Sequence, residues 1–153
     1  MAEISKIKRF FALPDLAKSA FEAGHFEEAH KYSTEMLELV ACSSRSEHIF
    51  PTGNAVHHGN LVLGWLALRS GDVEEAKARL LAAGQTAGSL QLDSFGPNMM
   101  LAKELLEHGE RDVVFEYFQL CARFWKRHQE RLNEWTSQID VISFKCKSRT
   151  SAE

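Results

Sequence analysis

Histidines are the residues of this sequence best suited to chemistry at neutral pH, because an imidazole titrates near pH 7 and binds metal ions. The sequence contains seven of them, and His57 and His58 are neighbours. Adjacent residues of a helix point in different directions, and no HExxH motif brings two histidines onto one face. A zinc site needs three or four converging ligands, so we predict no metal ion and no cofactor.

Carboxylates and thiols are the other groups that could carry a reaction. The acidic pairs Glu27-Glu28 and Glu74-Glu75 both fall in the first turn of an expected helix, where the helix dipole stabilises negative charge. Cys42 and Cys121 fall on apolar helix faces, where a thiol usually packs as a small hydrophobic group. The sequence therefore predicts no catalytic residue, and we expect the protein not to be an enzyme.

The composition is that of an ordinary folded domain, with 153 residues of which 44% are hydrophobic and 25% charged. Three cysteines without a CxxC pair indicate reduced thiols. The apolar run at residues 61–68 is far shorter than the roughly 20 residues that cross a bilayer, and residues 1–6 lack the apolar core of a signal peptide. We expect a cytoplasmic protein that binds no membrane. A net charge of -3 without a basic block argues against binding nucleic acid.

Apolar residues recur at three- and four-residue spacing along most of the chain, which predicts helices, and no strand-like alternation is present. Pro14 and Pro97 are expected in the first turn of a helix, where the missing N–H costs nothing. We predict a single domain at residues 1–142 and a disordered tail at 143–153. The expected helices are 14–23, 26–42, 56–70, 73–83, one beginning at 97 and a long one at 111–142, with loops at 43–55 and 84–96.

Three of these helices end in glycine followed by a polar residue, at Gly24-His25, Gly71-Asp72 and Gly109-Glu110, and a new helix begins within two or three residues. Each such turn predicts an antiparallel helical hairpin. When the three segments are aligned on the glycines, the matching positions are small or aliphatic: Leu16/Ala17/Ala20, Leu63/Gly64/Ala67 and Leu101/Ala102/Leu105 before the turn, and Ala29, Ala76 and Val114 after it. We predict an all-α fold of about three stacked antiparallel hairpins with a long C-terminal helix.

The segments Gly24-His25-Phe26-Glu27-Glu28-Ala29 and Gly71-Asp72-Val73-Glu74-Glu75-Ala76 resemble the turn and second-helix start of the tetratricopeptide repeat family. The copy that begins at Gly109 is weaker, and the glycines are spaced more widely than the family's period of about 34 residues. The resemblance covers roughly residues 13–124 and implies a TPR-like α-solenoid. An irregular helical bundle with the same hairpins is the alternative.

The first helix of each pair in that family lines a concave groove, which implies a protein-binding or scaffolding function. Cations and large apolar groups converge there, so the expected partner is a peptide or helix with acidic residues or a free C-terminal carboxylate, with Trp65 as its anchor. The alternative is that Trp65 is a core residue under the long loop or the last helix. The paired asparagines of the family's carboxylate-binding members are not evident. By alignment the groove residues are Lys18, Phe21, His58, Leu61, Trp65, Arg69, Met99 and Lys103.

The expected long last helix carries an apolar seam with a 3.5-residue period. The seam can cap the stack, as terminal helices of solenoids do, it can pair with a second copy in a homodimer, or it can bind a different protein. Its residues are Trp125, His128, Leu132, Trp135 and Ile139, with Phe118, Cys121 and Ile142 in the same register.

A different class of function is left open by the long connection at residues 84–98. Long loops within compact domains are often functional, and this one carries Leu92 and Phe95. The alternative is therefore a ligand-binding or enzymatic protein with a pocket formed by this loop, Trp65, His57 and His58. An enclosed cavity with converging polar groups would favour a ligand, and an open groove would favour an interaction module.

Overall fold

The described part of the chain is all-helical and contains no strand. The computed structural model describes residues 2–43 and 52–150, with the side chains of 4–43 and 52–139. The helices are α1 (Ala2–Glu22), α2 (Phe26–Cys42), α3 (Thr52–Arg69), α4 (Val73–Gly84), α5 (Leu90–Phe95), α6 (Met100–Glu107), α7 (Arg111–Phe124), the short 3₁₀ helix η1 (Lys126–His128) and α8 (Gln129–Thr150).

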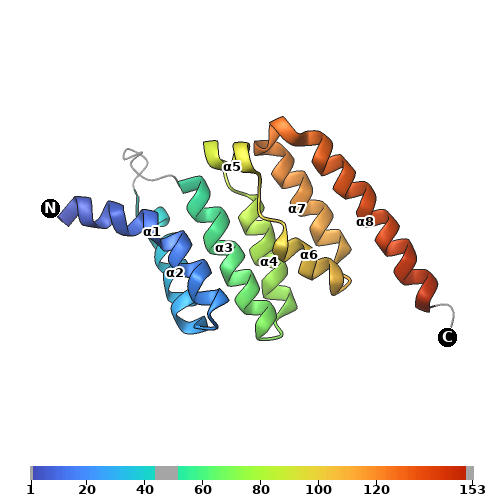
Figure 1. Cartoon of the computed structure of the whole chain (residues 1–153), viewed down its shortest axis with the longest axis horizontal. Helices are drawn as coiled ribbons and strands as arrows, with labels where there is room; N and C mark the ends of the chain where they lie inside the picture. Colours follow the sequence, from blue (N-terminus) through green and yellow to red (C-terminus); the bar gives the residue numbers. More distant parts are fainter. Residues whose placement is uncertain (1, 44–51, 151–153) are drawn as a thin grey trace.

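The helices follow one another along the long axis of the molecule, with α1 and α8 at opposite sides (Figure 1). Consecutive helices from α1 to α4 pack against each other, and α7 packs on α4, α6 and α8. The six-residue α5 lies beside η1, at the end of the molecule where α3 begins. None of the described helices is long and apolar enough to span a membrane.

Glycine turns join the pairs α1–α2, α3–α4 and α6–α7, as the sequence predicts. Gly24, Gly71 and Gly109 have φ angles of 80°, 84° and 86°, a left-handed conformation that other residues adopt only at a cost. At each turn the glycine N–H donates to the carbonyl three residues back, and the next N–H donates to the carbonyl five residues back. This double hydrogen bond is the Schellman motif, and it folds the second helix of each pair back onto the first.

Helix α1 is longer than the sequence predicts. We expected a helix from Pro14, but α1 begins at Ala2 and contains Pro14 in its interior. A proline there removes one backbone hydrogen bond. The preceding turn holds Phe10 and Leu13, which are 2% and 0% exposed in the core. Burial of these side chains offsets the missing bond, because tertiary packing supplies most helical stability.

The linker after α4 and the predicted last helix also differ from expectation. The connection at 84–96 contains the helix α5, and α6 begins at Met100 rather than at Pro97. The segment expected to form one helix over 111–142 is broken at Trp125, whose φ and ψ are -98° and 62°. Helix α8 then continues to Thr150, so the backbone is helical where the sequence predicts the start of a disordered tail.

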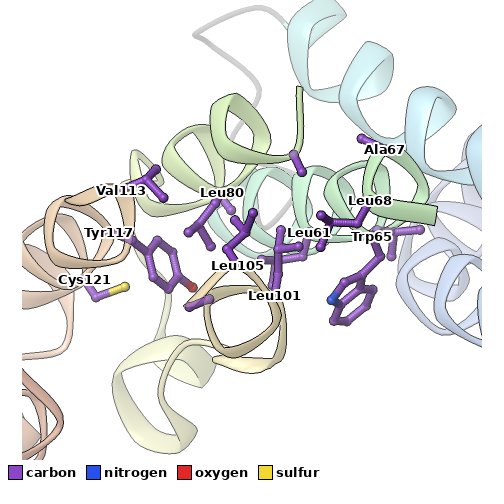
Figure 2. Close-up of a cluster of buried hydrophobic side chains, with 14 of the residues drawn as sticks. Leu61, Trp65, Ala67, Leu68, Leu80, Leu101, Leu105, Val113, Tyr117 and Cys121 are labelled. Carbon is purple, nitrogen blue, oxygen red and sulfur yellow. The ribbon is translucent and has the colours of Figure 1, made fainter. Parts of the chain in front are cut away.

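Aliphatic side chains of α3, α4, α6 and α7 meet in a continuous core (Figure 2). Leu80 and Leu105 are 0% exposed there, beside Tyr117 and Cys121 of α7. Burial raises the pKa of the Cys121 thiol to about 12, so this cysteine packs as a hydrophobic group, as predicted. The hydroxyl of Tyr117 donates a hydrogen bond to the carbonyl oxygen of Asn98 at 2.9 Å, which fixes the linker before α6 to α7.

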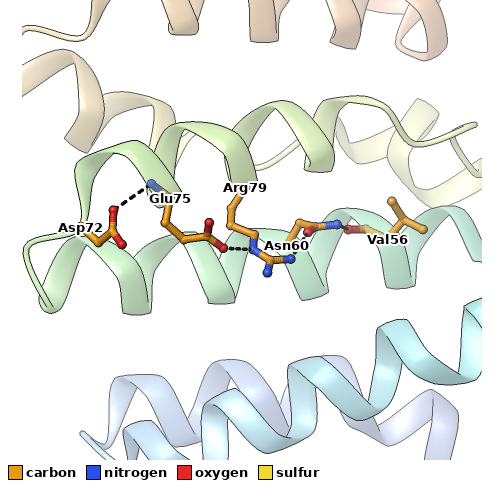
Figure 3. A network of polar contacts seen from close by, with 5 residues as sticks. All are labelled: Val56, Asn60, Asp72, Glu75 and Arg79. Atoms are coloured by element: carbon orange, nitrogen blue, oxygen red, sulfur yellow. Dashed lines mark hydrogen bonds and ion pairs between the residues drawn. The ribbon is translucent and has the colours of Figure 1, made fainter.

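A chain of polar contacts joins α3 to α4 (Figure 3). The Asp72 carboxylate caps α4 by accepting a hydrogen bond from the Glu75 N–H at 3.0 Å. Arg79 pairs with the Glu75 carboxylate at 2.7 Å and donates to the Asn60 side-chain oxygen at 3.2 Å. Asn60 in turn donates to the Val56 carbonyl at 2.9 Å. Glu75 therefore serves the structure, as its place in a first helical turn indicates.

Candidate functional site

His57 is a buried structural residue with both ring nitrogens bonded. Its Nδ1 lies 3.1 Å from the Ala83 carbonyl oxygen, and its Nε2 lies 3.1 Å from the backbone nitrogen of Asn98. The first contact requires Nδ1–H as a donor and the second requires a bare Nε2 as an acceptor, which together define the neutral tautomer. Burial lowers the pKa of His57 to about 4, so this ring does not exchange a proton near pH 7.

His58 lies beside His57, with ring centroids 5.3 Å apart, and lines a cleft. It is half-buried and forms no hydrogen bond within the described part of the chain. Burial lowers its pKa below the ordinary value, Asp15 acts in the opposite direction, and Lys18 lowers it further. Of the two adjacent histidines, only His58 lines this cleft.

Two adjoining hollows lie on either side of His58, with volumes of about 480 and 390 Å³. They share Asn54, His58 and Gln91, so we treat them as one feature and call it the α1–α3–α5 cleft. The larger hollow lies between α1, the first turns of α3 and the start of α5, and the smaller one lies between α3, α5 and the linker to α6. The cleft therefore brings α1 together with the 84–98 connection, which the sequence analysis identified as unusually long.

A hydrogen-bonded group of polar side chains forms the centre of the cleft. The Ser89 hydroxyl donates to Oδ1 of Asn54 at 2.5 Å, and Nδ2 of Asn54 donates to Oε1 of Gln91. The Ser89 oxygen also accepts a hydrogen bond from the Leu92 N–H at 3.0 Å and so caps α5. These bonds leave the Gln91 amide nitrogen and one N–H of Asn54 available to a ligand.

Large apolar side chains surround this polar centre and point largely into solvent. Phe11 is 57% exposed, Leu90 87% and Phe95 86%. Each of them lines one of the two hollows. Exposed apolar groups gathered around a concavity are a common property of surfaces that bind another molecule, so the α1–α3–α5 cleft is the candidate site.

One carboxylate gives the cleft its charge. Asp15 is exposed on α1 and is the only described lining residue that carries a full charge at neutral pH. It forms no ion pair with any described residue. Nearby charges are balanced, because Lys18 pairs with Glu22 at 3.8 Å and Asp93 pairs with Arg127 at 3.2 Å.

Three residues of the predicted concave groove contact one another. The rings of Phe21 and Trp65 stack with centroids 5.4 Å apart, and Trp65 is 7% exposed. The Arg69 guanidinium lies 5.6 Å from the Phe21 ring centroid and pairs with Glu104 at 3.1 Å. Arg69 of α3 therefore contacts α1 and α6, the first helices of the other two pairs.

The remaining groove residues are scattered between the core and the surface. Leu61 is buried, Met99 is half-buried, and Lys103 is exposed without an ion pair to a described residue. Only His58 of the predicted groove set lines the cleft. Binding of an acidic partner by the groove stays a prediction, and the structure gives it no open anchor at Trp65.

The apolar seam of the last helices is buried within the single chain. Trp125, Leu132 and Ile139 are 2%, 3% and 3% exposed. The ring of Trp125 lies between His128 and Trp135, with centroid distances of 5.2 and 5.7 Å. In this arrangement α8 covers α7, which corresponds to the capping alternative. Ile142 belongs to the same register, but its side chain lies outside those described.

The pocket of the alternative hypothesis forms only in part. The 84–98 connection and His58 line the α1–α3–α5 cleft, whereas Trp65 and His57 do not. No group of three or more His, Cys, Asp or Glu residues that could hold a metal ion is found among the described residues. His48 lies outside the described residues, as does the side chain of Cys146.

Sequence reasoning missed the contribution of α1 to the cleft. The larger hollow is lined by Phe11, Pro14 and Asp15. The sequence predicts a helix only from Pro14, so it makes no prediction of which side of the preceding turn is exposed. The adjacent phenylalanines at positions 10 and 11 were the available signal, since one of two neighbouring helical residues must point away from the core. Phe10 is buried and Phe11 is exposed.

Comparison with known proteins adds no relative for this chain: no family model matches the sequence, and no curated protein or solved structure is significantly similar to it.

Proposed function

We propose that this protein is an interaction module that binds a segment of another protein in the α1–α3–α5 cleft. The observation that carries the proposal is the combination of two joined hollows with Phe11, Leu90 and Phe95 exposed around them. Large exposed apolar side chains lower the solubility of a free protein. They become favourable when a partner covers them, because burial of a phenylalanine or leucine side chain is worth roughly 1.5–3 kcal/mol.

A TPR-like scaffold is part of the same proposal. The three identical glycine turns and the contacts of α1 with α3 and of α3 with α6 support a stack of repeated hairpins. The stack departs from a regular solenoid at α5, which is inserted between the second and third pairs. In this scheme the insertion supplies the partner-binding wall that a regular repeat lacks.

Binding rather than catalysis is favoured by the state of the buried reactive groups. The His57 pKa of about 4 and the Cys121 pKa of about 12 keep the ring neutral and the thiol protonated at pH 7. Neither group lines a described hollow. Among the described lining residues His58 is the one titratable ring, and no described acid or base is hydrogen-bonded to it.

The test is selection of random twelve-residue peptides on the wild-type protein, followed by anisotropy titration of the selected peptides. Phe95→Ser and Leu90→Ser should each weaken binding by about tenfold or more, the equivalent of about 1.4 kcal/mol. Both side chains are more than four-fifths exposed, so their replacement should leave the unfolding midpoint nearly unchanged.

Ile4→Ser is the matched control, because Ile4 is a large apolar residue that is 56% exposed and lines neither hollow. Its affinity should equal that of the wild type. Selected peptides that bind the Phe95→Ser and Leu90→Ser variants as tightly as the wild type would overturn the proposal. A selection that yields no binding peptide would do so as well.

A further inference from the structure

We infer that the segment bound in the α1–α3–α5 cleft is extended and carries a lysine or arginine two residues away from a large apolar side chain. The inference rests on the proposed function and adds the chemistry of the partner. It follows from three properties of the described lining: one carboxylate without an ion pair to a described residue, a centre of side-chain amides, and an apolar rim.

The charge of the partner is set by Asp15. Its carboxylate is the only full charge among the described lining residues, and it has no ion pair there. The cation closest to it in sequence on this face, Lys18, pairs with Glu22, and Arg127 near α5 pairs with Asp93. A cationic side chain placed beside Asp15 would gain attraction, whereas an acidic one would meet repulsion.

The conformation of the partner is set by the amides. Asn54 and Gln91 retain donor groups, as argued above, and a side-chain amide offers both a donor and an acceptor, as a peptide unit does. An extended segment has free backbone N–H and C=O groups that pair with such amides. A helix uses those groups internally, so it would leave the polar centre of the cleft without partners.

The apolar side chain of the partner is set by the distribution of the rim. Phe11 and Leu90 line the hollow that also contains Asp15, whereas Phe95 lines the other one. An aliphatic or aromatic side chain can therefore contact Phe11 and Leu90 while a basic residue two positions away, on the same face of an extended segment, reaches Asp15. In an extended chain, a second apolar residue at a two-residue spacing would lie on the same face, toward Phe95.

The test uses the peptides selected on the wild-type protein. The enriched sequences should carry lysine or arginine two residues away from leucine, isoleucine or phenylalanine. Asp15→Lys should weaken their binding by about tenfold, and changing the basic residue of the peptide to glutamate should restore affinity for that variant. An alanine scan of one peptide should show sensitivity at every second residue, rather than at the three- and four-residue spacing of a helix.

Glu116→Lys is the charge control, since Glu116 is an exposed carboxylate of α7 that lines no described hollow. It should leave the affinity within about twofold, as a distant surface charge does at physiological salt. Peptides that are lost on Phe95→Ser but bind Asp15→Lys unchanged, or that show helical periodicity, would refute this inference alone. Acidic peptides that depend on Lys103 would refute it in favour of the concave groove. Peptides indifferent to Phe95→Ser would refute the proposed function itself.

Discussion

The backbone N–H of Asn98 donates a hydrogen bond to Nε2 of His57 at 3.1 Å, although 41 positions separate the two residues. The other ring nitrogen of His57 bonds the Ala83 carbonyl at the end of α4. One imidazole therefore holds the linker before α6 against both α3 and α4. Asn98 and Pro97 line the smaller hollow, whereas His57 does not. His57 therefore stabilises a wall of the α1–α3–α5 cleft without lining it.

Replacing His57 by phenylalanine should lower the free energy of unfolding by about 2–4 kcal/mol. The variant keeps an aromatic ring but leaves the Ala83 carbonyl and the Asn98 N–H without their partner, and each unpaired buried group costs about 1–3 kcal/mol. Urea unfolding followed by circular dichroism at 222 nm measures the change. The control is His58→Phe, which breaks no described hydrogen bond and should change the free energy by less than about 1 kcal/mol. Equal losses in the two variants would contradict the role of His57.

Stability should fall as the pH is lowered from about 6.5 to about 4. The pKa of His57 is lowered from 6.5 to about 4 in the folded protein, so in this interval the unfolded chain binds a proton that the folded chain does not. Stability must therefore rise with pH there, and the full contribution is present above pH 6.5. The shift corresponds to roughly 3 kcal/mol. His58, whose pKa burial also lowers, acts in the same direction.

Urea unfolding at pH 7, 6 and 5 measures this dependence. The comparison between wild type and His57→Phe isolates His57, because the variant lacks the titrating group and should show a shallower slope. The pKa of Glu35 is lowered by its ion pair with Arg9, so the stability it contributes is lost only at more acid pH, below the ordinary carboxylate range. A wild-type stability that is constant between pH 7 and 5 would show that His57 is accessible to protons.

Much of the hairpin pattern could be predicted from the sequence because it depends on local chemistry. The glycines at 24, 71 and 109 are followed at once by polar residues and a new apolar period, and a left-handed turn needs no distant partner. Helix α2 begins at Phe26 and ends at Cys42, as predicted. The start of α1 could not be predicted in this way, because Pro14 is tolerated inside α1 only through the burial of Phe10 and Leu13.

The candidate site was less predictable, since it depends on where distant segments meet. His58 and the 84–98 connection were identified from the sequence, whereas Trp65 could be either a groove anchor or a core residue, and the sequence alone does not decide between the two. Whether a tryptophan at that position is exposed depends on Phe21, which lies on another helix and stacks on its ring. The end of helix α7 at Trp125 is also a tertiary effect. The helical periodicity of the sequence continues through this position, but the Trp125 ring packs on Gly96 in the linker between α5 and α6.

Two glycines should respond to alanine for different reasons and by different amounts. A Cβ at Gly53 in α3 would lie 2.0 Å from the carbonyl oxygen of Gly88, so the backbone must move, whereas a Cβ at Gly71 meets nothing within 4 Å. Gly53→Ala should therefore cost about 2–3 kcal/mol through overpacking. Gly71→Ala should cost about 1–2 kcal/mol through its left-handed φ alone, and Gly71→Asn should cost less, because asparagine tolerates that conformation. Thermal and urea unfolding give the ranking, which would be contradicted by a larger loss at Gly71.

The protein should be a monomer if α8 caps the stack as described. Leu132 and Ile139 are each 3% exposed within one chain, so a dimer formed through this seam would have to remove α8 from α7. Light scattering at micromolar concentration should give the mass of one chain. A stable dimer that dissociates on Leu132→Glu, with the helix content retained, would show that the seam joins two copies instead.

Trp125 should control how firmly α8 is held. Its ring is 2% exposed, packs between His128 and Trp135, and lies so close to Gly96 that a Cβ there would approach the ring to 2.5 Å. Trp125→Ala removes this contact, and truncating a buried tryptophan costs about 3–5 kcal/mol. Because the contact joins α8 to the α5–α6 linker, hydrogen exchange in residues 129–139 should accelerate far more than exchange in α3 and α4. Trp125→Phe retains a ring and should show a smaller acceleration. Uniform acceleration over all helices would mean that Trp125 stabilises the whole fold rather than the attachment of its last helix.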